Sequence, residues 1–405
     1  MSKSSPSGPR VALFSPFYFP ELISTGKANT YLGLNLVERG CAVTVVCSHP
    51  LYPDWEPKRS DDRLPGMNIL RGGGWLRYPK PASLRRMVLE LWFAAYSARR
   101  TFGLRKQVDT VVSIFPPSLF ALAVHALLPK TVRKVALVHD LQGVYAARQA
   151  GLAGRLIGAA IHAVERLAFR ASDLCIFLSY DMAKEAEAAY GLDAARVAVQ
   201  YPFITLTGDG ASGSALADIL PDGTQHVVYS GALGQKQNPD QLLEFMDGAA
   251  QRFPNAHFHI FSAGPIFDQL KAKYRESGHN RVQFHGLVPE EQLAELYARS
   301  AIQIIPQAKG TETGSLPSKL PNLIAAGVQI LTFCSPGSEV GKLLQEAGTG
   351  TIVEDWDLEQ FLALLDTALT EAREHSADER RARAATVLAR FQIGNLGRLV
   401  LGTEE

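Results

Sequence analysis

The stretch AIQIIPQAKGTETGSLPSKLPNLIAAGVQILTF, residues 301–333, decides the fold class of this chain. It begins with an uncharged apolar run, residues 301–306, and ends with another, residues 328–333; a short segment with helical spacing lies between them and ends at Gly327. Uncharged runs without strict alternation are typical of strands that are buried on both faces. A helix that joins two such strands is the βαβ unit of a parallel sheet, so the stretch predicts a parallel sheet covered by helices.

The same alternation of apolar runs and helix-period segments extends along almost the whole chain. The runs are RVALFSP, AVTVVCS, DTVVSI, KVALVHD, DLCIFLS and RVAVQYP, and then HVVYSG, HFHIFSAG, VQFHG, AIQIIP, VQILTF and GTIVE. The rhythm breaks once, between Pro202 and Gln225, in a segment rich in Gly, Ser, Asp and Pro that is typical of a domain boundary. We therefore expect an α/β chain of two Rossmann-like, doubly wound parallel-sheet domains, residues 1–202 and 203–385, with a closing helix at 386–405 that packs near the first domain. The carboxyl ends of the strands of two such domains would face a central cleft, where ligands of open α/β sheets bind.

Length and composition agree with two soluble domains. At 405 residues the chain exceeds the ~250–300 residues at which a single hydrophobic core stops growing. Hydrophobic residues make up 46% of it and charged residues 20%, and the formal net charge of +1 gives no general attraction to nucleic acid. The cysteines lie in or beside apolar stretches without the CxxC or Cys/His spacing of a zinc site, and we expect buried, reduced thiols at Cys41, Cys47, Cys175 and Cys334.

Two features bear on the location of the protein. The first residues, MSKSSPSGPR, form a polar tail without the apolar segment of a secretory signal, so we expect a cytoplasmic protein. Residues 111–129 carry no charged side chain and approach the ~20 residues that span a bilayer. Pro116 and Pro117 divide this stretch, so we interpret it as a buried strand followed by a separate helix.

A basic and apolar segment covers residues 80–106. Only Glu90 opposes its basic side chains, which are interspersed with Leu, Trp92 and Phe93 and are Lys80, Arg85, Arg86, Arg99, Arg100, Arg105 and Lys106. Such a segment suits the anionic inner face of the cytoplasmic membrane, to which the protein would bind peripherally. A core-facing helix with solvated arginines explains the same pattern, and the sequence leaves both alternatives open.

The stretch that decides the fold also holds candidate binding residues. Pro317 favours a helix start, so Ser318 and Lys319 are predicted in the first turn and Asn322 three to four residues further along one face. A hydroxyl, an ammonium and an amide at a helix N-terminus can hold a phosphate and a sugar diol. A solvated surface turn would leave the strongly apolar flanking runs unexplained.

Two further loops have the same design of strand, glycine turn and helix start. In VYSGALGQKQNPD, residues 228–240, Gly231 lets a diphosphate approach the main chain, and Lys236 and Gln237 stand before the next helix. This segment is neither a P-loop nor a GxGxxG fingerprint, which argues against nucleotide hydrolysis and a dinucleotide site. Near the N-terminus, Gly26 lies before a helix predicted to start around Lys27; a structural turn glycine is the alternative there.

Side chains near the ends of other runs are candidates for substrate contacts. His139 lies near the end of the run KVALVHD and can donate or accept a hydrogen bond near neutral pH. A core histidine whose hydrogen bonds are satisfied within the protein is the alternative. Glu339 follows a strand and would meet a sugar hydroxyl or stabilise a helix start. Tyr52 and Trp55 in HPLYPDW offer an acceptor platform or pack in the core. Two histidines alternate along one strand without a third metal ligand, so we interpret them as structural and expect no metal site: His257 and His259.

The chain as a whole resembles a known family. The segments FYFPELISTGKAN, HPLYPDW, VSIFPPSLF, HDLQG, YSGALGQKQ, FSAGP, FHGLVPEEQLAELYARSAIQIIP and LPSKLPNLIAAG are similar to GT-B glycosyltransferases of family 4, and within it to the WcaI-like enzymes of colanic-acid and other exopolysaccharide assembly. The likeness covers nearly the whole chain, and LPSK with the following AAG is its most specific part. It implies a GT-B fold, a nucleotide-diphosphate sugar (UDP or GDP sugar) bound mainly by the second domain, no cofactor, no required metal, and retention of the anomeric configuration.

The resemblance also assigns roles to residues. The catalytic residues that it implies are Lys236 and Lys319 at the diphosphate and His139 at the sugar. The predicted donor-binding residues are Gly231, Gln237, Gly264, Pro265, Ser318, Asn322 and Glu339, and the predicted acceptor-binding residues are Gly26, Lys27, Tyr52 and Trp55. The chain departs from the family at three positions, because Gly314 and Asn322 replace a Glu-x7-Glu pair and Ala232 replaces an arginine.

These observations predict a hexosyltransferase-type glycosyltransferase that moves a sugar to a lipid-linked or saccharide acceptor in cell-surface polysaccharide synthesis. Lys236, Lys319 and the backbone amide of Gly231 would stabilise the departing diphosphate, and His139 would orient the sugar. The expected partners are the nucleotide sugar, the acceptor and an anionic membrane surface, with no nucleic acid. Two alternatives stay open: a GT-B-fold sugar-nucleotide epimerase, and a non-catalytic nucleotide-binding partner protein.

Overall fold

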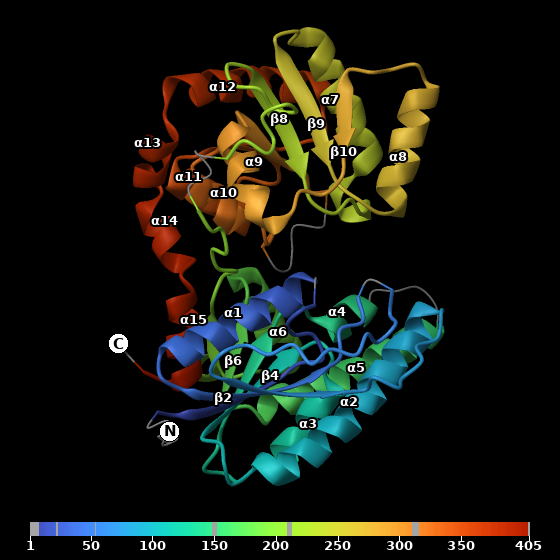
Figure 1. Ribbon diagram of the computed structural model, residues 1–405, viewed down its shortest axis with the longest axis vertical. Helices are drawn as coiled ribbons and strands as arrows, with labels where there is room; N and C mark the ends of the chain where they lie inside the picture. The colour runs from blue at the N-terminus through green and yellow to red at the C-terminus, as the bar shows by residue number, and fades with distance from the viewer. Residues whose placement is uncertain are drawn as a thin grey trace. The chain divides into compact units, whose positions relative to one another are not determined.

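The chain folds into two compact units, each a parallel sheet with helices packed on its faces (Figure 1). Unit 1 comprises Met1–Tyr201 and Ile393–Glu405, and unit 2 comprises Pro202–Gln392. The computed structural model describes residues 8–21, 23–52, 54–147, 152–208, 213–309 and 316–403, without the side chains of 145–147 and 152–154. Within these ranges every helix is too short or too polar to cross a membrane.

Seven parallel strands form the described sheet of unit 1, in the order β3-β2-β1-β4-β5-β6-β7. They are β1 (Arg10–Phe14), β2 (Ala42–Ser48), β3 (Met67–Gly72), β4 (Thr110–Phe115), β5 (Arg133–Val138), β6 (Leu174–Phe177) and β7 (Val197–Val199). The apolar runs of the sequence predicted all of them except β3. That strand, MNILRG, lies at the sheet edge and buries none of its residues fully, so it lacks an uncharged buried run.

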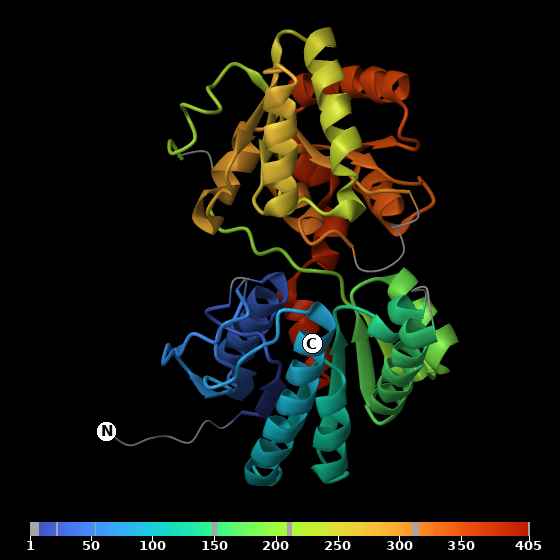
Figure 2. The same cartoon turned by 90° about the vertical axis from the view of Figure 1, so that its right-hand side faces the viewer.

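Helices cover both faces of this sheet. They are α1 (Ser24–Glu38), α2 (Ala82–Leu104), α3 (Leu119–Leu127), α4 (Gln142–Ala147), α5 (Leu152–Arg170), α6 (Tyr180–Tyr190), α15 (Ile393–Leu401) and the 3-10 helix η1 (Ala194–Arg196). Helix α15 packs against α1, and α3 packs against both α2 and α5. Figure 2 shows α2 and α3 side by side. Residues 111–129 contain most of β4 and all of α3, and Pro116 and Pro117 separate the strand from the helix, as expected.

The core of unit 1 is rich in phenylalanine. Phe120 of α3 contacts Phe14 of β1, Phe93 of α2 and Phe115 of β4, with ring centroids 4.9–6.5 Å apart. All four rings are at most 1% exposed. Burial of each such side chain contributes about 1.5–3 kcal/mol, so these contacts hold α2 and α3 firmly on the sheet.

Six parallel strands form the described sheet of unit 2, in the order β10-β9-β8-β11-β12-β13. They are β8 (Gln225–Ser230), β9 (Ala256–Phe261), β10 (Val282–His285), β11 (Ile302–Ile305), β12 (Gln329–Phe333) and β13 (Gly350–Val353). The helices are α7 (Pro239–Arg252), α8 (Pro265–Glu276), α9 (Leu293–Arg299), α10 (Leu320–Ala326), α11 (Glu339–Ala347), α12 (Leu358–Glu374), α13 (Ala377–Arg383) and α14 (Ala385–Arg390), with the 3-10 helices η2 (Gln235–Gln237) and η3 (Glu290–Gln292).

The stretch 301–333 forms the predicted unit of strand, helix and strand. Strands β11 and β12 pair in parallel, with Ile304 beside Leu331, and α10 connects them. Gly327 ends the helix at φ +68°, a conformation that glycine adopts without strain. Aromatic rings fill the core beside this unit, where Phe333 stacks on Trp356 with centroids 4.1 Å apart.

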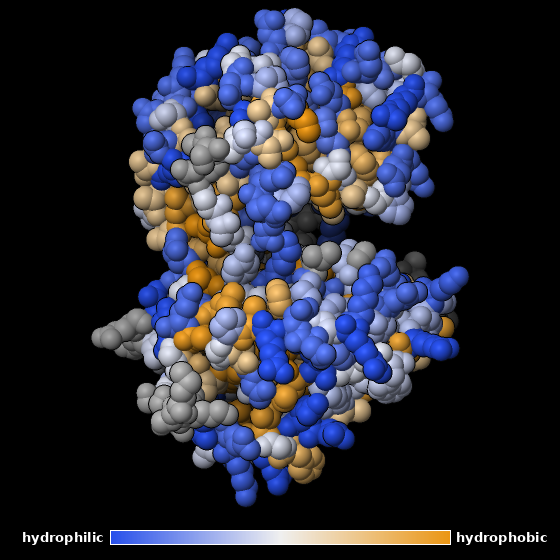
Figure 3. Space-filling model, viewed as in Figure 1, coloured by the Kyte–Doolittle hydropathy of each residue, from blue (hydrophilic) through white to orange (hydrophobic). Residues whose placement is uncertain are grey.

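The last part of the chain contains two helices where the sequence predicted one closing helix. Helix α14 ends unit 2 and α15 belongs to unit 1. Arg39 of α1 donates a hydrogen bond to the carbonyl oxygen of Gly394, at 2.9 Å, and so holds the start of α15 on unit 1. On the face of the molecule drawn in Figure 3, hydrophilic residues cover much of each unit, with patches of hydrophobic residues among them.

Candidate functional site

Lys319 lies at the carboxyl edge of the sheet of unit 2. Its ammonium donates a hydrogen bond to the carbonyl oxygen of Ile304, at 2.9 Å, and another to that of Ser230, at 3.2 Å. These carbonyls belong to the ends of β11 and β8, which are neighbours in the sheet. The ammonium also lies over the ring of Tyr229, 4.6 Å from its centroid. Three contacts from two strands therefore fix the position of this charge.

The charge of Lys319 lacks a counterion in the part of the chain that the structure describes. No carboxylate there lies within ion-pair distance of the ammonium, and burial lowers the pKa of this lysine from 10.5 to about 7. An ammonium has three N–H donors, and two of them point at the strand-end carbonyls. An anion at this edge would take the third donor and favour the charged form.

The loop after β8 carries the second predicted lysine. Lys236 is exposed on η2, and its backbone carbonyl accepts a hydrogen bond from the amide of Ala308, at 2.8 Å. The amide of Gly234 donates to Oε1 of Gln237, at 2.9 Å, so the Gln237 side chain closes the turn instead of projecting freely. Gln237 therefore has a local structural contact in addition to its predicted role at the donor.

Gly231 corrects one prediction. Its φ of +135° requires glycine, as the turn after β8 suggested. Its N–H, however, donates to the carbonyl oxygen of Phe261, at 3.0 Å, and extends the pairing of β8 with β9. The prediction that this amide stabilises a diphosphate is wrong for the described conformation, because the donor is already used.

Asn322 is also engaged inside unit 2. Its side-chain oxygen accepts hydrogen bonds from the amides of Thr205 and Leu206, at 2.8 and 3.1 Å, and its side-chain nitrogen donates to Thr205 Oγ1, at 3.0 Å. The side chain is buried and ties the segment after residue 202 to α10. This is a structural contact, and the predicted role of Asn322 at the donor stays a prediction. Gly314, the other position of the replaced Glu-x7-Glu pair, lies outside the described residues.

The remaining donor predictions also lie beyond strand ends of unit 2. Gly264 and Pro265 begin α8 after β9, and a Cβ atom on Gly264, whose φ is +106°, would meet no other atom within 4 Å. Ser318 is exposed just before α10. Glu339 is the first residue of α11, which Ser338 caps by accepting a hydrogen bond from Gly341. Because all of these follow parallel strands, they share the carboxyl edge with Lys319.

His139 occupies the corresponding edge of unit 1, directly after β5. Its backbone amide donates to the carbonyl oxygen of Phe115, at 3.0 Å, which fixes it beside the end of β4. Its ring nitrogen Nε2 is buried and, within the described ranges, has no hydrogen-bond partner. Burial lowers the pKa of this histidine to about 4, so the imidazole is neutral at pH 7. A neutral ring with an unused nitrogen can take one hydrogen bond from a substrate.

Glu21 organises the predicted acceptor region, and sequence reasoning missed it. This carboxylate is 4% exposed and accepts hydrogen bonds from the amides of Leu51 and Tyr52, both at 2.9 Å. Helix α1 starts at Ser24, three residues before the predicted Lys27. Gly26 lies against Glu21 so closely that a Cβ atom would come within 2.9 Å of the Glu21 Cβ, so packing requires glycine here.

Tyr52 and Trp55 have different surroundings. Tyr52 is 41% exposed and available to a ligand. Trp55 packs edge-on against Phe17 and Tyr78, with centroids 6.4 and 5.6 Å apart, and the guanidinium of Arg85 covers its ring at 4.3 Å. Trp55 thus belongs to a small aromatic cluster, which agrees with the core-packing alternative.

Two other carboxylates, the half-buried Glu90 and the buried Glu165, hold loops at the same edge of unit 1. Glu90 accepts hydrogen bonds from the amides of Ser118 and Leu119, at 3.0–3.2 Å. Glu165 accepts from the amide of Gly143, at 2.8 Å, and from the hydroxyl of Ser118, at 3.3 Å. It accepts further hydrogen bonds from Gln142 N and from the hydroxyl of Tyr190. An isolated glutamate in a helix has the sequence signature of a solvated side chain, so no pattern identified these two.

The histidines of unit 2 form a chain across three strands. His226 Nδ1 lies 3.0 Å from His259 Nε2, and His259 Nδ1 lies 3.1 Å from His285 Nε2. His226 Nε2 is 3.0 Å from the carbonyl oxygen of Pro221, which can only accept, so each ring carries its proton on Nε2. Among the described residues no group of three or more His, Cys, Asp or Glu side chains could hold a metal ion. The interpretation of His259 as structural agrees with this geometry.

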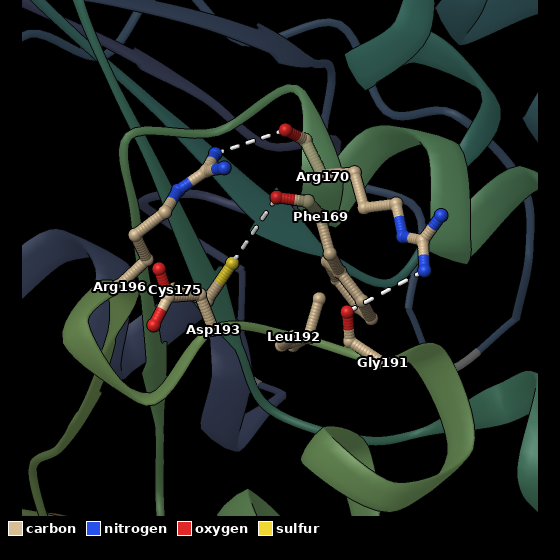
Figure 4. A pocket seen from close by; sticks show the side chains of 7 residues that line it. All are labelled: Phe169, Arg170, Cys175, Gly191, Leu192, Asp193 and Arg196. Atoms are coloured by element: carbon tan, nitrogen blue, oxygen red, sulfur yellow. Dashed lines mark hydrogen bonds between the residues drawn. The ribbon is translucent and has the colours of Figure 1, made fainter.

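A small cavity of about 270 Å³ lies away from these residues, at the amino ends of β6 and β7. Figure 4 shows its lining, in which Arg196 donates to the carbonyl oxygen of Arg170, at 2.9 Å, and the Cys175 thiol points to that of Phe169. Cys175 is buried, like the three other cysteines, and all four are free thiols. The cavity is on the opposite edge of the sheet from His139.

The sequence matches two protein families in succession. Residues 27–207 match Glycosyltransferase Family 4, and residues 218–386 match Glycosyl transferases group 1. A protein of Escherichia coli (strain K12) that bears the name colanic acid biosynthesis glycosyl transferase WcaI is 26% identical to this chain. The similarity covers 94% of this chain and 98% of that protein.

Solved structures confirm the predicted GT-B fold of two parallel-sheet α/β domains. WaaG, described as a glycosyltransferase involved in lipopolysaccharide biosynthesis, superposes with a TM-score of 0.71 at 17% identity, over 97% of this chain and 100% of that one. Sucrose-phosphate synthase from Thermosynechococcus elongatus superposes with a TM-score of 0.72 at 15% identity, over 98% of this chain and 100% of that one.

Proposed function

We propose that this chain, which belongs to the glycosyltransferases with a family 4 domain followed by a group 1 domain, transfers a sugar from a nucleotide-diphosphate sugar to an acceptor in cell-surface polysaccharide synthesis. Lys319 is the single observation that carries the proposal. Its ammonium is held by two strand-end carbonyls, and within the described part of unit 2 no carboxylate balances it. A fixed, uncompensated positive charge at a sheet edge suits the diphosphate of such a donor.

The reaction that this edge favours is the departure of a nucleoside diphosphate. As the bond between the sugar and the diphosphate breaks, negative charge grows on the diphosphate, and a cation already in place lowers the barrier. Lys319 supplies that charge, and the exposed Lys236 is the proposed second cation. The acceptor hydroxyl forms the new bond from the face that the diphosphate leaves and gives its proton to the departing oxygen, so the anomeric configuration is retained. The two lysines make a metal ion unnecessary in this scheme.

His139 is the proposed contact to the transferred sugar. Its imidazole is neutral at pH 7, because burial lowers its pKa to about 4, and its Nε2 has an unused hydrogen-bonding capacity among the described residues. A neutral ring orients a sugar hydroxyl without adding a charge that would oppose the positive character of the sugar in the transition state.

The names of the similar proteins support the choice of acceptor. One is named for colanic acid biosynthesis and another is described as involved in lipopolysaccharide biosynthesis. Both products are cell-surface polysaccharides, so the proposed acceptor is a lipid-linked or free saccharide and the proposed donors are UDP or GDP sugars. A lipid-linked acceptor lies in a membrane, and the basic segment 80–106 is the proposed contact of this chain with the anionic inner face.

Thermal unfolding with a panel of nucleotides tests the donor site. We expect UDP or GDP, and one of their sugars, to raise the unfolding temperature, because a ligand at 100 times its Kd adds about 2.7 kcal/mol. Lys319→Met should abolish the increase. Lys342→Met is the matched control, because Lys342 is exposed on α11 of the same unit. An increase that persists in Lys319→Met would contradict the proposed site.

Incubation of the protein with the stabilising nucleotide sugar separates transfer from the alternatives. A transferase forms a new glycoside only when an acceptor is added, and it then releases the nucleotide. Epimerisation without any acceptor would identify an epimerase instead. Binding without turnover, over a panel of lipid-linked and free saccharides, would identify a non-catalytic partner protein.

A further inference from the structure

The loop that follows β5 holds two buried polar atoms without a hydrogen-bond partner in the part of the chain that the structure describes. One is Nε2 of His139, and the other is Oε1 of Gln142, three residues later. Nearly all buried polar atoms of native proteins have a partner, so two exceptions this close together need an explanation. The proposed function uses the histidine ring and does not use Gln142.

The main chain around Gln142 is held firmly in place. The amides of Gln142 and Gly143 donate to the carboxylate of Glu165, at 3.2 and 2.8 Å. A Cβ atom on Gly143 would lie 2.7 Å from the Cα atom of His162, so this part of the chain packs directly on α5. The backbone that carries the Gln142 side chain is therefore positioned by other segments, as in a preorganised binding site.

The unused atom of Gln142 limits the kind of ligand that it can bind. An amide oxygen only accepts hydrogen bonds, so its partner must be a donor such as a hydroxyl group. The side chain as a whole is half-exposed, and the torsion of a terminal amide group is soft, so a ligand can turn the oxygen toward itself. A phosphate or a carboxylate brings no donor and does not fit.

Tyr180 adds an aromatic surface after the neighbouring strand. Strands β5 and β6 pair in parallel, with Val138 beside Phe177. Gln142 is the first residue of α4 and Tyr180 the first residue of α6, so both follow adjacent strands at the same edge of the sheet. The Tyr180 side chain is 56% exposed, and its ring contacts that of Tyr201 edge-on, with centroids 5.9 Å apart. An exposed ring held in this way offers an apolar face beside a polar group.

The residues next to this pair are acidic. Asp140 lies between the histidine and Gln142 in the chain, and Asp181 follows Tyr180 directly. A ligand with a negative group at this place would be brought close to like charges, which is a common way to reject a wrong ligand. The surroundings therefore favour a neutral molecule that has both hydroxyl groups and an apolar face.

We infer that Gln142 and Tyr180 form a subsite for a neutral hexose beside His139, an inference that rests on the proposed function. Oε1 of Gln142 accepts a hydrogen bond from a sugar hydroxyl, and the Tyr180 ring packs on the C–H face of the same sugar. In the proposed reaction this is the transferred sugar, because His139 contacts it. The subsite thus selects a neutral hexose over a uronic acid.

Titration calorimetry of the full chain with UDP, GDP, UDP-glucose, UDP-galactose, UDP-glucuronate and GDP-mannose tests the subsite. Gln142→Met, which keeps the length of the side chain, should weaken binding of the neutral nucleotide hexose that the wild type prefers by about 10- to 100-fold, because a buried hydroxyl loses its acceptor. Tyr180→Ala should weaken it by about 3- to 10-fold. In both variants the affinity for the free nucleotide should stay within about twofold, a difference that general damage to the fold would not produce.

The matched controls are Gln107→Met and Phe102→Ala. Both residues are exposed near the start of β4, at the other edge of the sheet, and Phe102 is 56% exposed, like Tyr180. They should bind every ligand as the wild type does. Gln142→Ala serves as the second variant if circular dichroism shows that Gln142→Met does not fold.

Three results would overturn the subsite. They are equal losses for the nucleotide and its sugar in the Gln142 variants, no loss for either, and wild-type preference for UDP-glucuronate over the neutral hexoses. Unchanged donor affinity with a raised KM for a saccharide acceptor would also overturn it, because the residues would then belong to the acceptor. If the wild type binds no nucleotide, the proposed function fails. Saturation-transfer NMR with free glucose, galactose and mannose then decides separately, because binding that Gln142→Met abolishes keeps the subsite and absence of binding removes it.

Discussion

The carboxyl edges of the two sheets are built with opposite charges. In unit 1, the carboxylates of the buried Glu21 and Glu165 and of the half-buried Glu90 accept hydrogen bonds from loop amides. In unit 2, the described edge holds Lys319, whose ammonium is bound by strand-end carbonyls. Amides that already have a carboxylate cannot bind a phosphate, whereas a lysine with a free donor can. The difference teaches that unit 2 is suited to an anion and unit 1 to neutral hydroxyl groups.

The largest effect that this contrast predicts is the loss of Lys319. Lys319→Met should reduce the rate of nucleotide release from the donor in the presence of acceptor by about 10²–10³, the scale for loss of one preorganised electrostatic group. Stability should not fall. The folded pKa, about 7, lies below the ordinary value of 10.5, so the charged side chain costs folding free energy and methionine removes that cost.

Steady-state kinetics and urea unfolding check both parts of this prediction. Lys342→Met controls for a general loss of positive charge in unit 2. A Lys319→Met protein that turns over at the wild-type rate would remove the contrast between the two edges. One that unfolds much more easily would show that the lysine is structural.

Glu165 is the corresponding test in unit 1. Glu165→Gln replaces a buried acceptor of four hydrogen bonds with a neutral group that has one acceptor oxygen and adds two donors. We expect a loss of about 2–4 kcal/mol in the unfolding free energy, because hydrogen bonds to a charged group are strong and buried donors lose their partner. The stabilisation of unit 2 by nucleotide should stay as in the wild type.

Urea unfolding followed separately in each unit measures this effect, since two units need not unfold together. Glu187→Gln, at a partly exposed position of the neighbouring helix α6, is the control for a lost carboxylate. A Glu165→Gln variant as stable as the control would mean that the loop amides of unit 1 do not depend on the carboxylate.

The pH dependence of donor binding sharpens the same contrast. The pKa of free Lys319 is about 7, and contact with a diphosphate raises it, so binding takes up a proton above pH 7. The affinity for the nucleotide sugar should therefore be highest at or below pH 7 and weaken as pH rises, by at most about tenfold per pH unit. Titration calorimetry at several pH values checks this, with Lys319→Met giving a flat profile. A wild-type affinity that is constant from pH 6.5 to 9 would contradict it.

The parts of the fold that bury uncharged runs could be predicted from the sequence. Uncharged apolar runs such as those of β11 and β12 are typical of strands that are buried on both faces, so they predicted the parallel sheets. The segment where these runs stop predicted the division of the chain near residue 202. The edge strand β3 could not, because half-buried residues and Arg71 hide its pattern. Local patterns predict burial well and sheet edges poorly.

The site was predictable to a smaller extent. Lys319 was identified because a charged side chain at a helix start between two buried strands is placed where a ligand can bind. The engagement of the Gly231 amide with Phe261, and of Asn322 with Thr205, depends on neighbours that are distant in the sequence. Glu165 was missed for the same cause, since its partners come from three separate segments. Residue type predicts what a group can do, and the tertiary structure decides which partner uses it.

The histidine chain of unit 2 predicts a smaller effect at acid pH. Burial lowers the pKa of His259 from 6.5 to about 3, so the unfolded chain binds the proton more tightly than the folded one. The unfolding free energy should therefore be constant above about pH 6.5 and fall as pH decreases from there toward about 3. Charged groups also affect the pKa values of the two outer histidines of this hydrogen-bonded chain. Lys271 acts on His285, and Arg299 and Asp222 act on His226.

Urea unfolding of unit 2 at pH 5 and pH 7.5 measures this effect. His259→Leu should flatten the pH dependence of the unfolding free energy, because it removes the central ring. His257→Leu, at an exposed position on the same strand, should leave the pH dependence unchanged. Equal slopes in all three proteins would exclude His259 as the titrating group.

Substitution of Asn322 completes the comparison and decides between a structural role and a role at the donor. Asn322→Ala removes the oxygen that accepts from Thr205 and Leu206 and should lower the unfolding free energy of unit 2 by about 1–3 kcal/mol, the cost of buried amides left without a partner. If its task is structural, the affinity for the nucleotide sugar stays within about twofold of wild type at a temperature where the variant is folded. Thr205→Val, which removes only the hydroxyl that Asn322 Nδ2 contacts, is the control for the weaker bond. An Asn322→Ala protein with unchanged stability and a tenfold weaker donor affinity would return Asn322 to the donor site, and the anionic ligand would then be held by α10 as well as by Lys319.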